Sequence, residues 1–80
     1  MKKLQFYFRN GCHLCEDMWQ QLLEEQKDFD FELIAFDIDR DEALNAKYTT
    51  LIPVLTDDNQ LICHYYLDRV ALHRCLRERN

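Results

Sequence analysis

One stretch decides the fold: Phe6-Tyr7-Phe8-Arg9-Asn10-Gly11-Cys12-His13-Leu14-Cys15. In it an apolar run ends in Asn-Gly, and two cysteines follow at C-x-x-C spacing. Apolar side chains then recur at helical spacing to about residue 26, so the stretch predicts a strand, a tight turn and a helix. At the start of that helix, unpaired N–H groups and the helix dipole stabilise a thiolate on the first cysteine, and the second cysteine lies one turn later. This arrangement predicts a site for thiol–disulfide exchange.

Length and composition limit the class of protein. The chain has 80 residues, 48% of them hydrophobic, which predicts one domain over residues 1–80 with a modest core. Apolar runs stay well short of the roughly 18 residues that span a bilayer, and the N-terminus lacks the pattern of a signal peptide. The net charge of −5 argues against nucleic acid and anionic membranes as partners. We therefore expect a cytoplasmic monomer.

The four cysteines do not suggest a secreted disulfide framework, because there is no secretion signal and the apolar content suffices for a core. Reduced thiols in a cytosolic protein explain them better. Cys12 and Cys15 are expected to be reactive because they stand at a helix start. Cys63 lies in a predicted strand and Cys75 on an apolar helical stripe, so both are expected to be small core hydrophobes.

The remaining patterns give the order β-α-β-α-β-β-α. Strands are predicted at residues 3–8, 31–36, 53–56 and 60–65, and helices at 12–26, 37–47 and after Asp68, which suits an N-cap. The first unit is a parallel βαβ unit, and the last two strands form a hairpin around residues 57–59. The two longer helices have apolar stripes formed by Leu14, Met18, Trp19, Leu22 and Leu23 and by Val70, Ala71, Leu72, Cys75 and Leu76. Trp19 is expected to anchor its helix in the core.

This layout resembles the thioredoxin superfamily in its small, glutaredoxin-like form, over essentially the whole chain. The resemblance rests on the C-x-x-C between strand and helix and on Ile52-Pro53 before a strand. It implies an α/β, thioredoxin-like fold: a four-stranded mixed sheet, made of a βαβ unit and a hairpin, flanked by three helices. It also implies that Cys12 attacks, that Cys15 resolves, and that Pro53 follows a cis bond beside the dithiol. The backbone of Ile52 would pair with an extended substrate segment.

The chain departs from the glutaredoxin pattern where glutathione would bind. Glutaredoxins typically carry Gly-Gly shortly before an acidic residue at the last helix, and this chain has Tyr65-Tyr66-Leu67 before Asp68. Asp68 alone remains of the glutathione-holding set. His13 follows the first cysteine, where it is either a solvated residue or a group that tunes thiol acidity and contacts substrate.

Three functions compete. The first is a dithiol–disulfide oxidoreductase that reduces a protein or small-molecule disulfide through a mixed disulfide at Cys12, with no bound cofactor. An external reductant, thioredoxin reductase or the glutathione system, would restore the dithiol. The second is a module that binds zinc or an iron–sulfur cluster with Cys12, Cys15 and either His13 or ligands from a partner, although neither a second C-x-x-C nor a His pair completes four ligands in this chain. The third is an adaptor that kept the scaffold and lost turnover. We expect the first, with no metal.

Overall fold

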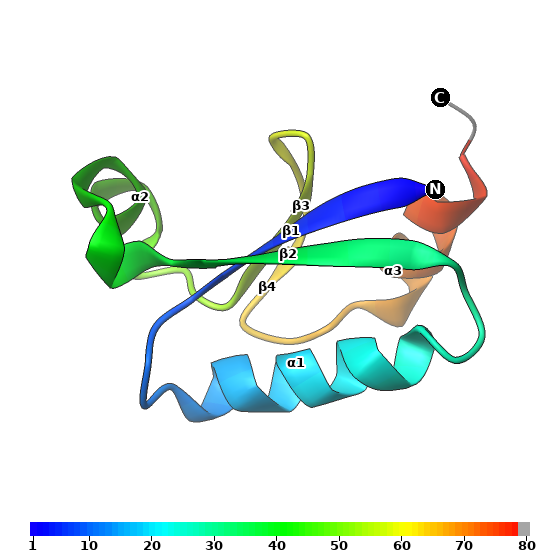
Figure 1. Ribbon diagram of the computed structural model, residues 1–80, viewed down its shortest axis with the longest axis horizontal. Helices are drawn as coiled ribbons and strands as arrows, with labels where there is room; N and C mark the ends of the chain where they lie inside the picture. Colours follow the sequence, from blue (N-terminus) through cyan, green and yellow to red (C-terminus); the bar gives the residue numbers. More distant parts are fainter. Residues whose placement is uncertain (79–80) are drawn as a thin grey trace.

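The strands and helices follow the predicted order. The structure, a computed structural model, describes residues 1–78. Its elements are β1 (Lys2–Phe8), α1 (His13–Glu25), β2 (Phe31–Asp37), the short 3₁₀ helix η1 (Ile38–Arg40), α2 (Glu42–Tyr48), β3 (Val54–Asp57), β4 (Gln60–His64) and α3 (Arg69–Arg77) (Figure 1). None of the helices in the described part of the chain is long and apolar enough to cross a membrane.

The sheet has four strands in the order β2-β1-β3-β4. β1 and β2 run parallel, with Phe6 opposite Ala35, whereas β3 runs antiparallel to both β1 and β4. The predicted βαβ unit and hairpin are thus confirmed. The tip of the hairpin needs left-handed backbone at Asp58 (φ 48°) and Asn59 (φ 71°), residue types that tolerate it.

Each face of the sheet has its own apolar cluster. Leu4 and Phe6 of β1 pack with α1, α3 and the facing residues of the other strands on one side. Tyr7 points to the other side, where Ile38, Tyr48 and Val54 surround it near α2. Figure 1 shows α1 along one side of the sheet and α2 at one end of the other. The second half of β1 is covered on both faces, which explains its aromatic run Phe6-Tyr7-Phe8.

Each α-helix starts at a side-chain N-cap. Asp41 Oδ1 accepts hydrogen bonds from the N–H groups of Ala43 (2.9 Å) and Leu44 (3.1 Å), and α2 therefore starts at Glu42. The expected helix over residues 37–47 is thus shorter, because η1 precedes it: Asp37 Oδ1 accepts from the Asp39 N–H and holds that separate turn. The N-cap role expected of Asp68 is confirmed below.

The assignment of two residues to the buried apolar stripes was wrong. Val70 is 67% exposed and Leu23 is 38% exposed. Successive residues of a helix are rotated by about 100°, so Val70 lies about 200° from the fully buried Leu72, on the opposite face of α3. Leu23 follows the buried Leu22 and lies at the margin of the buried stripe of α1. Counting apolar residues without their angles therefore overestimated both stripes.

Candidate active site: the Cys12–Cys15 dithiol

The turn before the dithiol uses the chain's single glycine. β1 ends at Phe8, and Gly11 has φ 78°, a left-handed backbone that side chains with a Cβ disfavour. A Cβ added at Gly11 would meet no atom within 4 Å, so the requirement is for backbone conformation and not for space. Gly11 thus lets the chain reverse from β1 into α1 directly before Cys12.

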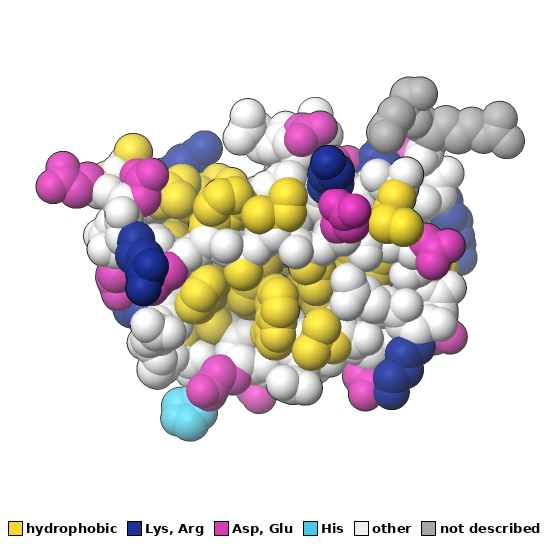
Figure 2. Space-filling view, viewed as in Figure 1, with side chains coloured by type: hydrophobic (Ala, Val, Ile, Leu, Met, Phe, Trp, Pro, Cys, Tyr) yellow, Lys and Arg dark blue, Asp and Glu magenta, His cyan; other side chains and the backbone are white. Residues whose placement is uncertain are grey.

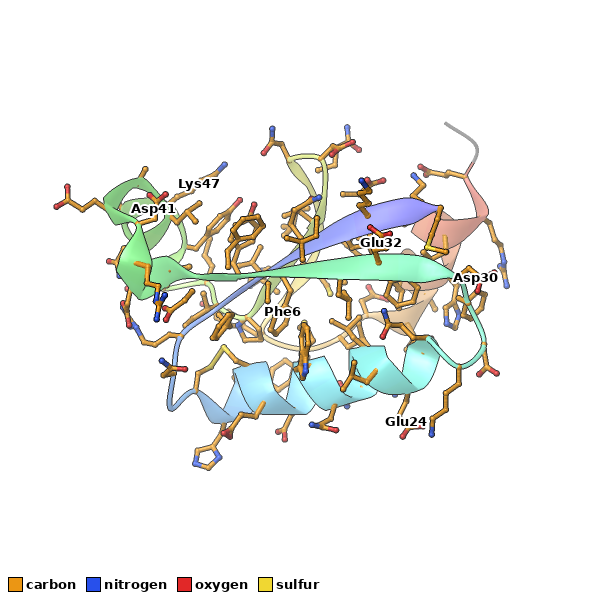
Figure 3. The ribbon with its side chains drawn as sticks, in the orientation of Figure 1. Phe6, Glu24, Asp30, Glu32, Asp41 and Lys47 are labelled. Atoms are coloured by element: carbon orange, nitrogen blue, oxygen red, sulfur yellow. A yellow bond between two sulfur atoms is a disulfide. The ribbon has the colours of Figure 1, made fainter. Side chains whose placement is uncertain are left out.

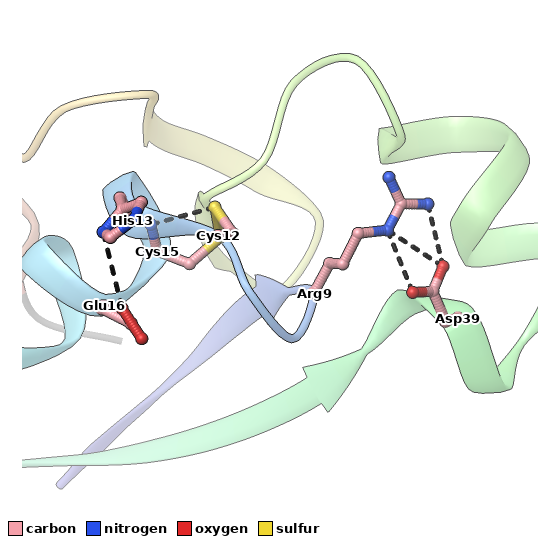
Figure 4. The surroundings of a disulfide bond; sticks show 6 residues. All are labelled: Arg9, Cys12, His13, Cys15, Glu16 and Asp39. Carbon is pink, nitrogen blue, oxygen red and sulfur yellow. Dashed lines mark hydrogen bonds and ion pairs between the residues drawn. A yellow bond between two sulfur atoms is a disulfide. The ribbon is translucent and has the colours of Figure 1, made fainter.

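Cys12 and Cys15 form a disulfide at the start of α1, with their Cα atoms 5.2 Å apart (Figure 4). Cys12 is the N-cap residue of α1, and its Sγ accepts a hydrogen bond from the Cys15 N–H at 3.1 Å. Cys12 is half-buried, while Cys15 is only 3% exposed. An N–H group aimed at the more accessible sulfur stabilises that sulfur as a thiolate once the disulfide is reduced.

His13 does not approach the sulfurs. Its side chain is 97% exposed and its Nδ1 lies 3.9 Å from the Glu16 carboxylate, as Figure 4 shows. Glu16 is the acidic residue of the first turn, where its negative charge disfavours a thiolate on Cys12 and so counteracts the effect of the helix N-terminus on that sulfur. Of the two expectations for His13, the position fits a solvated residue.

Pro53 is buried, and the Ile52–Pro53 peptide bond is cis. Ile52 packs against both apolar clusters, and Cys12 packs against the first of them. The Ile52 N–H donates to the Tyr48 carbonyl at 3.2 Å, so this group is not free to pair with the extended substrate segment expected at Ile52. Its carbonyl is the group left for that role.

Asp68 lies directly before α3, at the position expected of it as an N-cap residue. Its Oδ1 accepts from the Ala71 N–H at 3.0 Å, so the carboxylate caps α3. The cap satisfies one of the unpaired N–H groups of the first turn. Within the described residues Asp68 is exposed, and its capping bond holds the loop before α3 in place.

Tyr65 is a site residue that the sequence did not predict. Its φ is 65°, its N–H donates to the Pro53 carbonyl at 2.9 Å, and its hydroxyl donates to the Thr50 carbonyl at 2.5 Å. Its ring also contacts the ring of His64, with the centroids 4.4 Å apart. Tyr65 therefore ties the loop before α3 to the segment that carries Pro53. No sequence signal marked it, because aromatic residues rarely adopt left-handed backbone.

Arg9 and Asp39 form a second link that sequence reasoning missed. The Arg9 guanidinium donates to both carboxylate oxygens of Asp39 at 2.8–3.1 Å, and Asn45 donates to the same carboxylate at 2.8 Å. Hydrogen bonding from Arg9 holds the pKa of the Asp39 carboxyl below its usual value. The pair joins the turn before the dithiol to η1, although the two residues lie thirty positions apart (Figure 4).

The other two cysteines are confirmed as core residues, each 8% exposed. Burial raises the pKa of the Cys63 thiol. Burial and the neighbouring Asp57 raise the pKa of Cys75 to about 11, and the Cys75 thiol lies 3.4 Å from the Asp57 carboxylate. Both thiols are thus protonated near neutral pH. Within residues 1–78 no group of three or more His, Cys, Asp or Glu side chains is placed to hold a metal ion.

The fold and the site define the class: a thioredoxin-fold protein with a C-x-x-C pair at the start of its first helix. The chain belongs to a family described as "Glutaredoxin-like domain (DUF836)", whose model matches residues 3–77. A search among curated proteins gave no match.

Solved structures agree with this assignment. The chain is similar to protein Ne2328 of Nitrosomonas europaea, with 40% identity, a TM-score of 0.85, and 94% of this chain and 91% of that chain covered. A protein from X. campestris is 32% identical, with a TM-score of 0.66 and 91% and 93% covered. Mitochondrial thioredoxin 3 of Saccharomyces cerevisiae, in its oxidized form, is 22% identical, with a TM-score of 0.63 and 95% and 76% covered, and shows the same fold.

Proposed function

We propose that the protein is a dithiol–disulfide oxidoreductase that reduces disulfides of proteins. The observation that carries the proposal is the unequal burial of two bonded cysteines at a helix start. Cys12 is accessible and receives the Cys15 N–H, whereas Cys15 is 3% exposed. An attacking thiol needs access and a stabilised thiolate, while a resolving thiol needs only to reach the first sulfur.

The proposed reaction has two exchanges. The Cys12 thiolate attacks one sulfur of the substrate disulfide, forms a mixed disulfide and releases the other substrate sulfur as a thiolate. Cys15, after losing its proton, attacks Cys12 Sγ and releases the second substrate sulfur. The substrate gains two electrons, and the protein loses two as the Cys12–Cys15 disulfide forms. An external reductant, thioredoxin reductase or the glutathione system, then supplies two electrons and two protons and restores the two thiols.

The surface near Pro53 supports a protein substrate over glutathione. Leu51 is 36% exposed, Tyr65 38% and Tyr66 70%, and the Tyr65 N–H is already bonded to Pro53. Exposed aromatic side chains beside a site favour contact with another protein surface. An extended substrate segment would form main-chain hydrogen bonds with the segment before Pro53, and the Ile52 carbonyl would accept one of them. We place this activity in a reducing compartment, the cytoplasm, where such a dithiol is kept active.

The roles of the two cysteines separate in one experiment. Insulin reduction by dithiothreitol should be accelerated by the wild-type protein, and Cys12→Ser should abolish that acceleration. Cys15→Ser should accumulate a mixed disulfide with the substrate, visible as added mass that dithiothreitol removes. Cys75→Ala is the matched control and should keep the activity, because its thiol is buried and protonated. An active Cys12→Ser variant, or no trapped species with Cys15→Ser, would contradict the proposed mechanism.

A further inference from the structure

β2 forms an unprotected edge of the sheet. It has seven residues and pairs with β1 without a register shift, and its other side has no neighbouring strand among the described residues. The opposite edge, β4, is shorter, and its pairing with β3 has an irregularity at Leu55/Thr56. Short and bulged edges resist further pairing, whereas a long regular edge presents a row of unpaired N–H and C=O groups. β2 also contains no Pro and no Lys.

An apolar groove runs beside this edge, on the side of α1. Its apolar lining includes Phe8, Trp19 and Ala35, its charged lining consists of Arg9 and Glu16, and its volume is about 310 Å³. Phe6 lies beneath it, between the sheet and α1, with its ring centroid 5.2 Å from that of Trp19 (Figure 3). Figure 2 shows apolar side chains gathered across the middle of this face of the molecule. The Ile34 side chain, 39% exposed, lies on the other face of β2, because neighbouring side chains of a strand alternate between its faces.

The charge of this side of the molecule is strongly negative. Residues 12–37, which comprise the dithiol, α1 and β2, contain eight acidic side chains and one basic side chain, Lys27. Lys27 pairs with Glu24 at 3.1 Å, and the nearby Arg9 pairs with Asp39. From other elements, Arg69 pairs with Glu25 and Arg40 with Asp37, and Lys3 of β1 lies opposite Glu32. The acidic side chains of this range outnumber these cations. Asp30 and Glu32 are exposed, and Glu32 points to the side of β2 away from α1 (Figure 3). The field at the β2 edge therefore attracts a positively charged segment.

We propose that the β2 edge and its groove, defined by Phe8, Trp19 and Ala35, with Glu32 and Ile34 on the other face of β2, bind an extended, positively charged segment of a partner protein. The segment adds a fifth strand to the sheet. Its apolar side chains enter the groove, and its Lys or Arg side chains lie on the other face near Glu32, since side chains of a strand alternate between the faces. A second copy of this chain fits poorly, because two such acidic edges would repel each other.

The groove lies next to the dithiol but away from the Pro53 loop. Gly11 and Cys15 belong to its lining, whereas Ile52, Pro53 and Tyr65 do not. A partner bound on β2 would therefore leave the accessible side of Cys12 free to meet a disulfide. The inference goes beyond the proposed activity, because binding at the β2 edge can be measured on the oxidised protein without turnover. If the peptide does not bind at β2, the proposed disulfide reduction is unaffected, and the reverse also holds.

A pair of synthetic peptides tests the inference. The probe is an end-capped peptide of about eight residues with alternating Val and Lys, and the control replaces each Lys by Glu. Trp19 is the only tryptophan, so its fluorescence reports occupation of the groove, and amide shifts in ¹H–¹⁵N spectra locate the site. We expect the Val–Lys peptide to shift the Trp19 emission and the β2 amides, and to bind at least about ten times more tightly than the Glu peptide. A Val–Lys peptide with a central Pro, which cannot pair along its length, should bind several-fold more weakly.

Matched variants check the charge term. Glu32→Lys should weaken binding of the Val–Lys peptide by about three-fold or more, and Glu42→Lys, an equal charge change on α2, should leave it unchanged. Raising the salt from about 20 mM to about 300 mM should weaken binding as well. Equal affinities for the Lys and Glu peptides, equal affinity for the Pro-containing peptide, shifts confined to residues 50–53 and 65–67, or self-association through β2 would each overturn the proposal.

Discussion

Removal of the Tyr65 hydroxyl tests the link between the two loops at the dithiol. In the wild-type protein this hydroxyl donates to the Thr50 carbonyl at 2.5 Å, and the Tyr65 N–H donates to Pro53. Tyr65→Phe deletes the first bond and keeps the second. A neutral hydrogen bond contributes about 0.5–1.5 kcal/mol to stability. Because Tyr65 is 38% exposed, water replaces part of the loss, and the expected cost is near the lower end, about 0.5–1 kcal/mol.

Urea denaturation followed by circular dichroism measures this cost, and Tyr66→Phe is the matched control. Tyr66 is 70% exposed, and its removed hydroxyl should leave stability within about 0.3 kcal/mol of wild type. In the insulin assay Tyr65→Phe should also lower the rate of reduction, because the segment that carries Pro53 loses a hydrogen bond. In the urea experiment Tyr66→Phe should keep the wild-type unfolding midpoint. Equal stability of Tyr65→Phe and wild type, with equal rates, would refute the anchoring role.

Three further outcomes follow from burial and charge. Reduced Cys12 should react with a brief pulse of iodoacetamide at neutral pH before Cys63 and Cys75, whose pKa values burial raises; peptide mapping that finds either buried thiol modified first would be evidence against this order. The Cys75 pKa is about 11 in the folded protein against a reference of 9.0, so the thiol stays protonated in the folded state. Stability should be unaffected by this group below about pH 9 and should fall by roughly 2 kcal/mol between about pH 9 and pH 11, where the unfolded chain loses the proton first. Denaturation at both ends of that range should show a smaller fall for Cys75→Ala. Leu22→Ala, at a fully buried site, should cost about 2–5 kcal/mol in urea denaturation, and the exposed Val70→Ala should cost less than about 0.5 kcal/mol; similar values for the two would contradict their assignment to opposite environments.

Local sequence patterns were sufficient to predict most of the strands and helices and their order. The strand, Gly11 and the C-x-x-C are close in sequence, and their order alone predicts a strand, a turn and a helix that presents Cys12 at its N-cap. Alternation and helical spacing likewise predicted the parallel βαβ unit and the hairpin, because these units join neighbouring parts of the chain. Asp68 was recognisable as an N-cap because capping uses the side chain of the residue directly before the helix.

Only the tertiary structure decided which of these parts meet. Tyr65 reaches Thr50 and Pro53, and Arg9 reaches Asp39, across separations that no local pattern encodes. The Ile52 N–H is bonded to Tyr48 because the chain folds back after α2, a fact that spacing alone could not contain. The apolar groove at β2 likewise depends on β2 lying at the edge of the sheet. Local chain chemistry thus determines the elements and the dithiol, while long-range packing determines the surfaces around it.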